Sequence, residues 1–158
     1  MNQDKVSQLI HALRDIQRAE DFKLVIGNDE LPFWWDFATL YEADGETTYN
    51  DEKDDYDFHR CGTVGCALGL AIHLGLTRYG PEVARSAQFV FDEAGADLGF
   101  TEFETSELFG CTATSSTYGV DDEEDVTPGM IADELERRVI AEFGSMSVIQ
   151  PKPWDVVK

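Results

Sequence analysis

The sequence predicts a mainly α-helical protein that folds as one compact domain. A length of 158 residues suits a single domain with a hydrophobic core of its own. Aromatic residues make up 11% of the chain and include 10 Phe, too many for a disordered segment. Apolar residues recur at helical spacing in several segments, and no ladder of strands stands out. We expect a compact bundle of about five to six helices around a central apolar helix over residues 64–74, with acidic loops.

Two amphipathic helices are expected near the two ends of the chain. One covers the N-terminus up to about Glu20, and Asn2 or Asp4 can cap its start. The other begins at Thr127-Pro128, since a proline is well tolerated in the first turn of a helix. The apolar residues at helical spacing are Val6, Leu9, Ile10, Leu13 and Ile16 in the first helix, and Ile131, Leu135, Val139 and Phe143 in the last.

Shorter elements are expected between these two helices. Residues 31–41 have a proline in the first turn and several apolar residues on one face, which predicts a short helix. A further helical stretch follows over 81–98, and the capping box at 101–104 starts a helix that ends near Gly110. Residues 22–26 suit a short strand or an extended connector.

The central helix is expected over residues 64–74, with Thr63 as its cap and Gly75 as its stop. Apolar residues surround it on nearly all sides, which is typical of a buried helix. Gly65 and Gly69 lie four residues apart and allow a neighbour to approach closely. That neighbour is either another helix or a ligand.

The chain carries a large excess of negative charge. It has 32 Asp and Glu against 12 Lys and Arg, which gives a net charge of −20 and argues against direct binding to nucleic acid or to an anionic membrane. We expect one domain over 1–144, with an acidic insertion at 43–57 and an acidic loop at 119–126. Residues 145–158 form a tail that docks through Trp154. The acids expected to bind a partner are Asp51, Glu52, Asp54, Asp55, Asp57, Asp121, Asp122, Glu123, Glu124 and Asp125.

The sequence favours a cytoplasmic location. Its N-terminus is polar and lacks the apolar region of a secretory signal. The longest apolar run, Gly62 to Leu76, falls short of the roughly 20 residues that cross a bilayer. The three cysteines are an odd number, which favours reduced thiols over a disulfide framework.

The stretch from His59 to Cys66 carries the most reactive residue types in the chain. A cysteine at a helix N-terminus has a lowered pKa, so Cys61 or Cys66 could act as a nucleophile with His59 or His73 as its base. The same region could bind zinc, although four residues separate its two cysteines. Buried structural thiols are the simpler interpretation, and we expect no catalytic residue, no metal site and no cofactor. The zinc ligands would be His59, Cys61, Cys66 and Cys111.

The segment from Cys61 to Gly69 resembles the mark of a group of small uncharacterised proteins from bacteria and their phages, C-G-T-x-x-C-x-x-G at the start of an apolar helix. An aromatic element at Phe33 to Phe37 and a Leu-Gly turn at Leu98-Gly99 extend the likeness. This chain departs from the group in its acidic insertion and in Leu70, where a Trp is common. The resemblance implies a compact helical domain of phage or bacterial origin, with no catalytic residue to transfer.

The charge favours a binding protein over an enzyme. We expect a non-enzymatic inhibitor that occupies the basic site of a nucleic-acid-binding protein or complex as a DNA mimic, in the manner of phage anti-CRISPR or anti-restriction proteins. One alternative is a small-molecule or nucleotide-sequestering protein with its pocket near Gly65 and Gly69. A second alternative is a cysteine-dependent enzyme. The sequence predicts no oligomeric state. The arginines available to a nucleotide are Arg60, Arg78, Arg85, Arg137 and Arg138.

Overall fold

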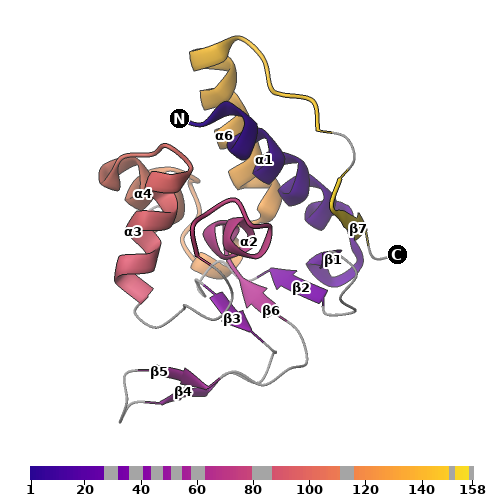
Figure 1. The fold of residues 1–158 in the computed structure, drawn as a ribbon, viewed down its shortest axis with the longest axis vertical. Coiled ribbons are helices and arrows are strands. Elements are labelled where there is room, and N and C mark those ends of the chain that lie inside the picture. Colours follow the sequence, from indigo (N-terminus) through magenta and orange to yellow (C-terminus); the bar gives the residue numbers. More distant parts are fainter. Residues whose placement is uncertain are drawn as a thin grey trace.

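The fold combines a group of α-helices with a mixed β-sheet (Figure 1). In the described ranges the five α-helices contain more than twice as many residues as the strands, which confirms the mainly helical class. None of the helices in these ranges is long and apolar enough to cross a membrane. The computed structural model describes residues 1–26, 32–35, 41–43, 48–50, 55–57, 63–79, 87–110, 116–149 and 152–156.

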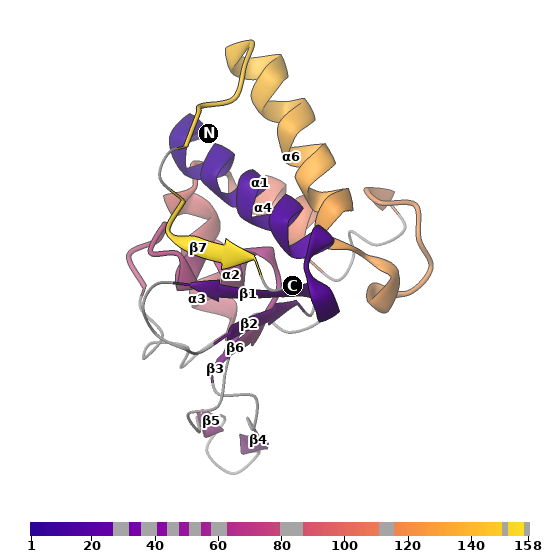
Figure 2. The same cartoon turned by 90° about the vertical axis from the view of Figure 1, so that its right-hand side faces the viewer.

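Helices α1 (Gln3–Arg18) and α6 (Pro128–Phe143) pack against each other in antiparallel directions (Figures 1 and 2). The backbone N–H of Gly129, at the start of α6, donates to the Gln17 side chain near the end of α1 over 2.9 Å. At the opposite end, the N-terminal amine lies 3.5 Å from the carboxylate of Glu142. The two helices predicted near the ends of the chain therefore form one pair.

Three helices begin at the capping residues that the sequence indicated. The Asn2 side chain accepts a hydrogen bond from the backbone of α1, and that of Thr127 does the same for α6. Thr101 and Glu104 form a reciprocal capping box at the start of α4 (Glu102–Phe109). These contacts satisfy N–H groups that have no partner within a helix, and they confirm the predicted starts.

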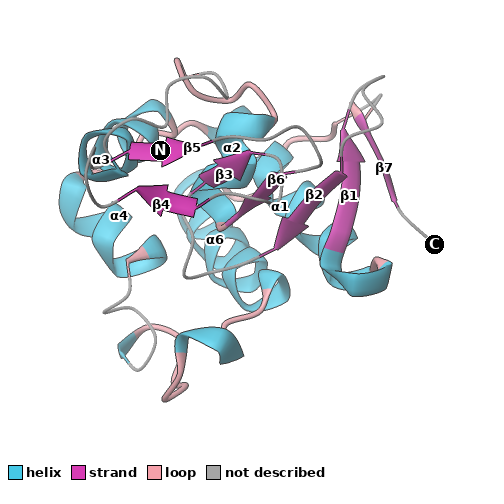
Figure 3. Ribbon diagram, turned by 90° about the horizontal axis from the view of Figure 1, so that it is seen from below, coloured by secondary structure: helices cyan, strands magenta, loops and turns pink. Residues whose placement is uncertain are grey.

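A five-stranded sheet, which the sequence did not reveal, has the order β3-β6-β2-β1-β7. Strands β2 and β6 are parallel, and the other neighbouring pairs are antiparallel. Helices α1 and α2 (Ala67–His73) contact its strands, and the helices lie behind the sheet in the view of Figure 3. The strands are β1 (Lys23–Ile26), β2 (Pro32–Trp35), β3 (Tyr41–Ala43), β6 (Thr63–Gly65) and β7 (Trp154–Val156).

The prediction of a helix over residues 31–41 is wrong. This segment contains strand β2, and Tyr41 begins strand β3. Trp34 lies opposite Lys23 of β1 on one side and opposite Val64 of β6 on the other. Aromatic residues favour extended backbone when neighbouring strands are available, and the local sequence does not show that those strands are present.

The apolar helix α2 (Ala67–His73) begins later than predicted, with Cys66 as its N-cap. Its expected first turn is strand β6, because Thr63–Gly65 pairs with β2 on one side and β3 on the other. Every residue of the helix before His73 is buried. Gly75 has a left-handed φ of 72°, which agrees with its predicted role as the stop.

The acidic insertion is not a loop throughout. Strands β4 (Thr48–Asn50) and β5 (Asp55–Asp57) form a separate two-stranded hairpin, which extends from the domain at the bottom of Figure 1. Tyr49 lies opposite Tyr56 in its register. Tyrosine and threonine favour extended backbone, which accounts for pairing in a segment otherwise rich in acids.

The hydrophobic core lies where α1, α2, α6 and the sheet meet. It continues toward α3 (Ala87–Asp97) and α4, which pack side by side (Figure 1). Gly95 of α3 lies so close to Thr105 of α4 that a Cβ atom at position 95 would collide with the threonine side chain. The largest fully buried side chains are Leu9, Ile10, Leu13, Ile16, Leu24, Phe33, Leu68, Leu70, Leu98, Leu108, Ile131 and Leu135.

The C-terminal segment adds strand β7 to the sheet beside β1 (Figure 2). Trp154 is 5% exposed, and its Nε1 donates to Oδ2 of Asp15 over 2.9 Å. Lys152 Nζ lies 2.7 Å from the same oxygen, and Arg18 donates to Oδ1 over 2.6 Å. Burial by itself would raise the pKa of Asp15, but these three hydrogen bonds outweigh it and hold the pKa below its ordinary value.

Replacing Gly95 with alanine should destabilise the protein by about 1–3 kcal/mol, because the added methyl group forces α3 and α4 apart. The measurement is urea unfolding followed by circular dichroism. Ala96→Ser, an exposed change in the same helix, serves as the control and should stay within about 0.5 kcal/mol of the wild type. Equal stability of Gly95→Ala and the wild type would contradict the close packing.

Asp15→Asn should lower the free energy of unfolding by about 1–3 kcal/mol at pH 7, because it removes a buried charged acceptor. The native pKa of Asp15 is lowered, so its contribution is complete above the unfolded value of about 3.9 and disappears as the pH falls through the native value. The difference between mutant and wild type should therefore shrink below pH 4. Asp133→Asn, at an exposed ion pair, is the control. A pH-independent difference would contradict this role of Asp15.

Candidate functional site

The run of acids at residues 121–125 forms an ordered turn, which we call the acidic turn. Glu123–Asp125 makes a short 3-10 helix, and the Asp125 N–H donates to the Asp122 carbonyl over 3.1 Å. The Glu124 N–H lies 3.3 Å from the Asp122 carboxylate. The turn belongs to the segment that precedes α6 and lies at the side of the domain in Figure 2. Its exposed residues are Asp121, Asp122, Glu124 and Asp125.

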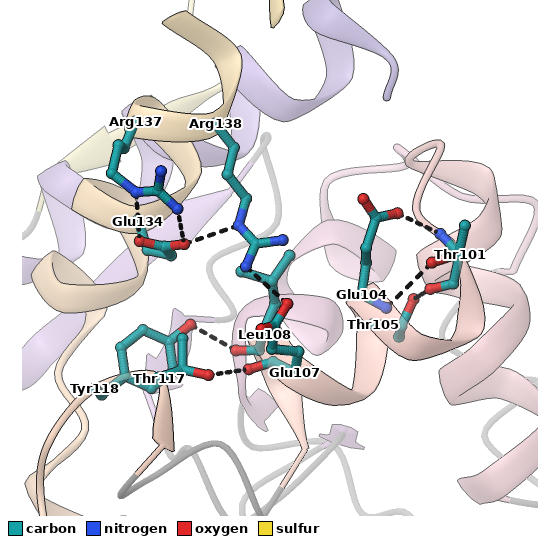
Figure 4. Close-up of polar contacts among 10 residues, drawn as sticks. All are labelled: Thr101, Glu104, Thr105, Glu107, Leu108, Thr117, Tyr118, Glu134, Arg137 and Arg138. Atoms are coloured by element: carbon teal, nitrogen blue, oxygen red, sulfur yellow. Dashed lines mark hydrogen bonds and ion pairs between the residues drawn. The ribbon is translucent and has the colours of Figure 1, made fainter. Parts of the chain in front are cut away.

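The segment before the acidic turn is fixed to the end of α4 (Figure 4). The Thr117 hydroxyl donates to the Glu107 carbonyl over 2.8 Å, and the Tyr118 hydroxyl donates to the Leu108 carbonyl over 2.6 Å. Carbonyls in the last turn of a helix have no partner within the helix, so these hydroxyls satisfy them. Burial, together with the nearby carboxylates of Glu134 and Glu107, raises the pKa of Tyr118, which keeps its hydroxyl a donor.

The segment after the acidic turn is held by the core and by the start of α6. Val126 is 1% exposed, and its carbonyl accepts a hydrogen bond of 3.2 Å from Nε1 of Trp35 in the sheet. Thr127 then caps α6, and Pro128 is buried in its first turn. The acidic turn is therefore an exposed segment between two fixed ends.

The carboxylates of the acidic turn have no cationic neighbour among the described residues: no ion pair formed in these ranges involves Asp121, Asp122, Glu124 or Asp125. All five described arginines pair with carboxylates elsewhere. The pairs are Arg14 with Asp133 and Glu136, Arg18 with Asp15, Arg78 with Asp97, Arg137 with Glu134, and Arg138 with Glu107 and Glu134.

Arg138 links the two helices on either side of the acidic turn (Figure 4). Its guanidinium lies 2.9 Å from Glu107 of α4 and 2.8 Å from Glu134 of α6. Arg137 also pairs with Glu134, and hydrogen bonds from Arg137, then Arg138, hold the pKa of Glu134 below its ordinary value. The arginine pair that could have received a nucleotide is therefore engaged with carboxylates of the protein itself.

The described residues bring together only part of the reactive group around Cys66. Cys66 is 2% exposed at one end of α2, and His73 lies at the other end. Seven helical residues separate the backbones of these two positions by about 10 Å. His59, Cys61 and Cys111 lie outside the described residues. Within the described part of the chain, no group of three His, Cys, Asp or Glu side chains could hold a metal ion.

The second acidic segment is described only in part. Asp55 and Asp57 lie at the two ends of strand β5. Asp51, Glu52 and Asp54 lie outside the described residues. The structure therefore describes the backbone of the acidic turn throughout but the acidic insertion only in part.

Sequence reasoning identified the acids of the turn but missed the residues that position it. Thr117 and Tyr118 belong to a Ser/Thr-rich stretch that the sequence marks as irregular. Trp35 lies 91 residues before the Val126 carbonyl to which it donates. The local signal is Trp35 itself, because the N–H of a buried tryptophan usually finds a hydrogen-bond partner.

Comparisons of the chain with protein-family models, with curated proteins and with solved structures find no match. The resemblance of the Cys61–Gly69 segment to small phage and bacterial proteins stays a prediction.

Tyr118→Phe should loosen the acidic turn, because the hydroxyl that satisfies the Leu108 carbonyl is lost from a half-buried site. We expect faster amide hydrogen exchange across 117–126, and a stability loss of about 1–2 kcal/mol. Hydrogen exchange read by mass spectrometry measures the effect, and peptides from α1 serve as the internal control. Unchanged protection of 117–126 would show that the hydroxyl does not fix the turn.

Proposed function

We propose that the protein is a non-enzymatic inhibitor that binds the basic surface of a nucleic-acid-binding protein in place of nucleic acid. The observation that carries this proposal is the acidic turn: four exposed carboxylates with no ion-pair partner among the described residues, held at both ends by partly buried hydrogen bonds. A nucleic-acid mimic needs negative charges at fixed positions. A turn ordered during folding offers them without a further loss of conformational freedom on binding.

The net charge of −20 supports the same function. Charge of one sign attracts a basic groove over a distance and accelerates association, and added salt weakens that attraction. The acidic insertion, with Asp51, Glu52, Asp54, Asp55 and Asp57, forms a second part of the proposed binding surface. The resemblance of residues 61–69 to phage proteins extends the proposal to one class of partner, the nucleases of bacterial defence.

The two alternative functions have weaker support in the described residues. A nucleotide-sequestering protein needs cations that can reach phosphate, whereas Arg78, Arg137 and Arg138 are each paired with a carboxylate. A cysteine-dependent enzyme needs an accessible thiolate, whereas the Cys66 side chain is buried. An inhibitor that acts through surface charge requires neither.

The test is capture of a partner from a bacterial lysate at low and at moderate salt, followed by a DNA-binding assay on the captured protein. The wild type should retain a nucleic-acid-binding protein at low salt, release it at moderate salt, and displace labelled duplex DNA from it. A turn variant with Asp121→Asn, Asp122→Asn, Glu124→Gln and Asp125→Asn should displace that DNA at least tenfold less well, since it lacks the four fixed charges.

The matched control neutralises four exposed carboxylates elsewhere and changes the net charge by the same amount. We expect it to resemble the wild type. Capture of no nucleic-acid-binding protein at either salt, or equal loss in the turn variant and the control, would contradict the proposed function. The control changes are Glu20→Gln, Asp21→Asn, Asp133→Asn and Asp155→Asn.

A further inference from the structure

A shallow groove with an exposed aromatic ring lies between α3 and α4. Phe103 is 76% exposed, which makes it one of the most exposed large apolar side chains among the described residues. The groove that it lines has a volume of about 560 Å³, so it can receive a side chain or a short peptide segment. Its lining residues are Phe91, Asp92, Thr101, Glu102, Phe103 and Ser106.

The groove combines apolar surface with negative charge. Phe91 and Phe103 supply aromatic surface from α3 and α4, and Asp92 and Glu102 place one carboxylate on each of these helices. The described lining residues include no lysine or arginine, and neither carboxylate takes part in an ion pair with another described residue. An occupant that complements this groove therefore brings a cation together with apolar surface.

An arginine side chain meets both requirements. Its planar guanidinium can stack on an aromatic ring while its N–H groups donate to carboxylates, and its methylene chain covers apolar surface. A lysine ammonium is more strongly hydrated and makes no bidentate contact with a carboxylate, so it fits less well. A second copy of this chain would bring a charge of −20 toward an acidic groove, which disfavours self-association.

We propose that the groove between α3 and α4 is a docking site for an arginine-bearing segment of the partner protein, with Phe103 as the surface on which the guanidinium stacks. The proposal rests on the proposed function in one respect, that the partner is basic. The groove adds a contact that depends on the chemistry of one arginine side chain. The acidic turn, in contrast, attracts a basic surface through its charge. Phe103 thus adds a second basis for discrimination among the basic partners that the acidic turn attracts.

The probe is an acetylated and amidated hexapeptide of alternating arginine and leucine, titrated into the ¹⁵N-labelled protein at moderate salt. Amide shifts should change at residues 91–92 and 101–106 of the groove. Phe103→Ala should weaken binding about three- to tenfold, the range expected for a cation–π contact, and Phe103→Trp should retain or strengthen it. A peptide with citrulline in place of arginine keeps the shape without the charge and should bind at least tenfold more weakly.

Matched variants distinguish peptide binding in the groove from attraction of the peptide by the overall charge. Phe143→Ala removes another exposed phenylalanine, and Glu142→Gln removes another exposed carboxylate; both should bind like the wild type. Glu102→Gln should weaken binding. Because Phe103 and Glu102 are exposed, these variants should keep the melting temperature of the wild type, which is checked first.

Besides peptide shifts confined to the acidic turn, three results would overturn the docking site. They are equal binding by Phe103→Ala and Phe143→Ala, equal binding of the citrulline peptide, and a concentration-dependent dimer that Phe103→Ala dissociates, which would assign the groove to a second copy. Failure of the docking site can be distinguished from failure of the proposed function. Peptide shifts confined to the acidic turn would overturn only the groove. Capture of a partner that depends on Phe103 but not on the acidic turn would overturn only the inhibitor mechanism.

Discussion

Ion pairing within the fold determines which exposed carboxylates of this protein remain without a cationic partner. Each described arginine is bound to a carboxylate, and two of these contacts join helices: Arg14 connects α1 to α6, and Arg138 connects α6 to α4. A surface ion pair contributes little to stability, about 0–1 kcal/mol. The larger consequence is the distribution of charge. Because the five described arginines are engaged in these contacts, none of them neutralises the carboxylates of the acidic turn.

The position of that charge depends on packing. The acidic turn joins α4 to α6, and its flanking residues are held by Tyr118 on one side and by the buried Val126 on the other. The turn therefore loses its conformational entropy during folding, and a partner that binds it orders little additional chain. A fixed set of charges can match one basic groove better than another, whereas a flexible acidic tail attracts basic surfaces with little discrimination. This difference is the physical basis of the proposed inhibitor function.

Features that depend on contacts within three or four residues could be predicted from the sequence. The caps at Asn2, Thr101 and Thr127 and the apolar faces of α1 and α6 are of this kind. The sheet could not be predicted, because its strands are three or four residues long and β7 pairs with β1 at the opposite end of the chain. The acids of the turn were visible as a charge run, but its anchors depend on tertiary contacts. The exposure of Phe103 likewise follows only from how α3 packs on α4.

The most direct test of the account is the salt dependence of binding between this protein and its captured partner, measured beside that of duplex DNA on the same partner. If fixed carboxylates replace phosphates, the logarithm of the dissociation constant should rise steeply with the logarithm of salt concentration for both ligands, and each should exclude the other. The turn variant should show a shallower slope than the wild type. Binding that is independent of salt, or simultaneous binding of protein and DNA, would contradict the account.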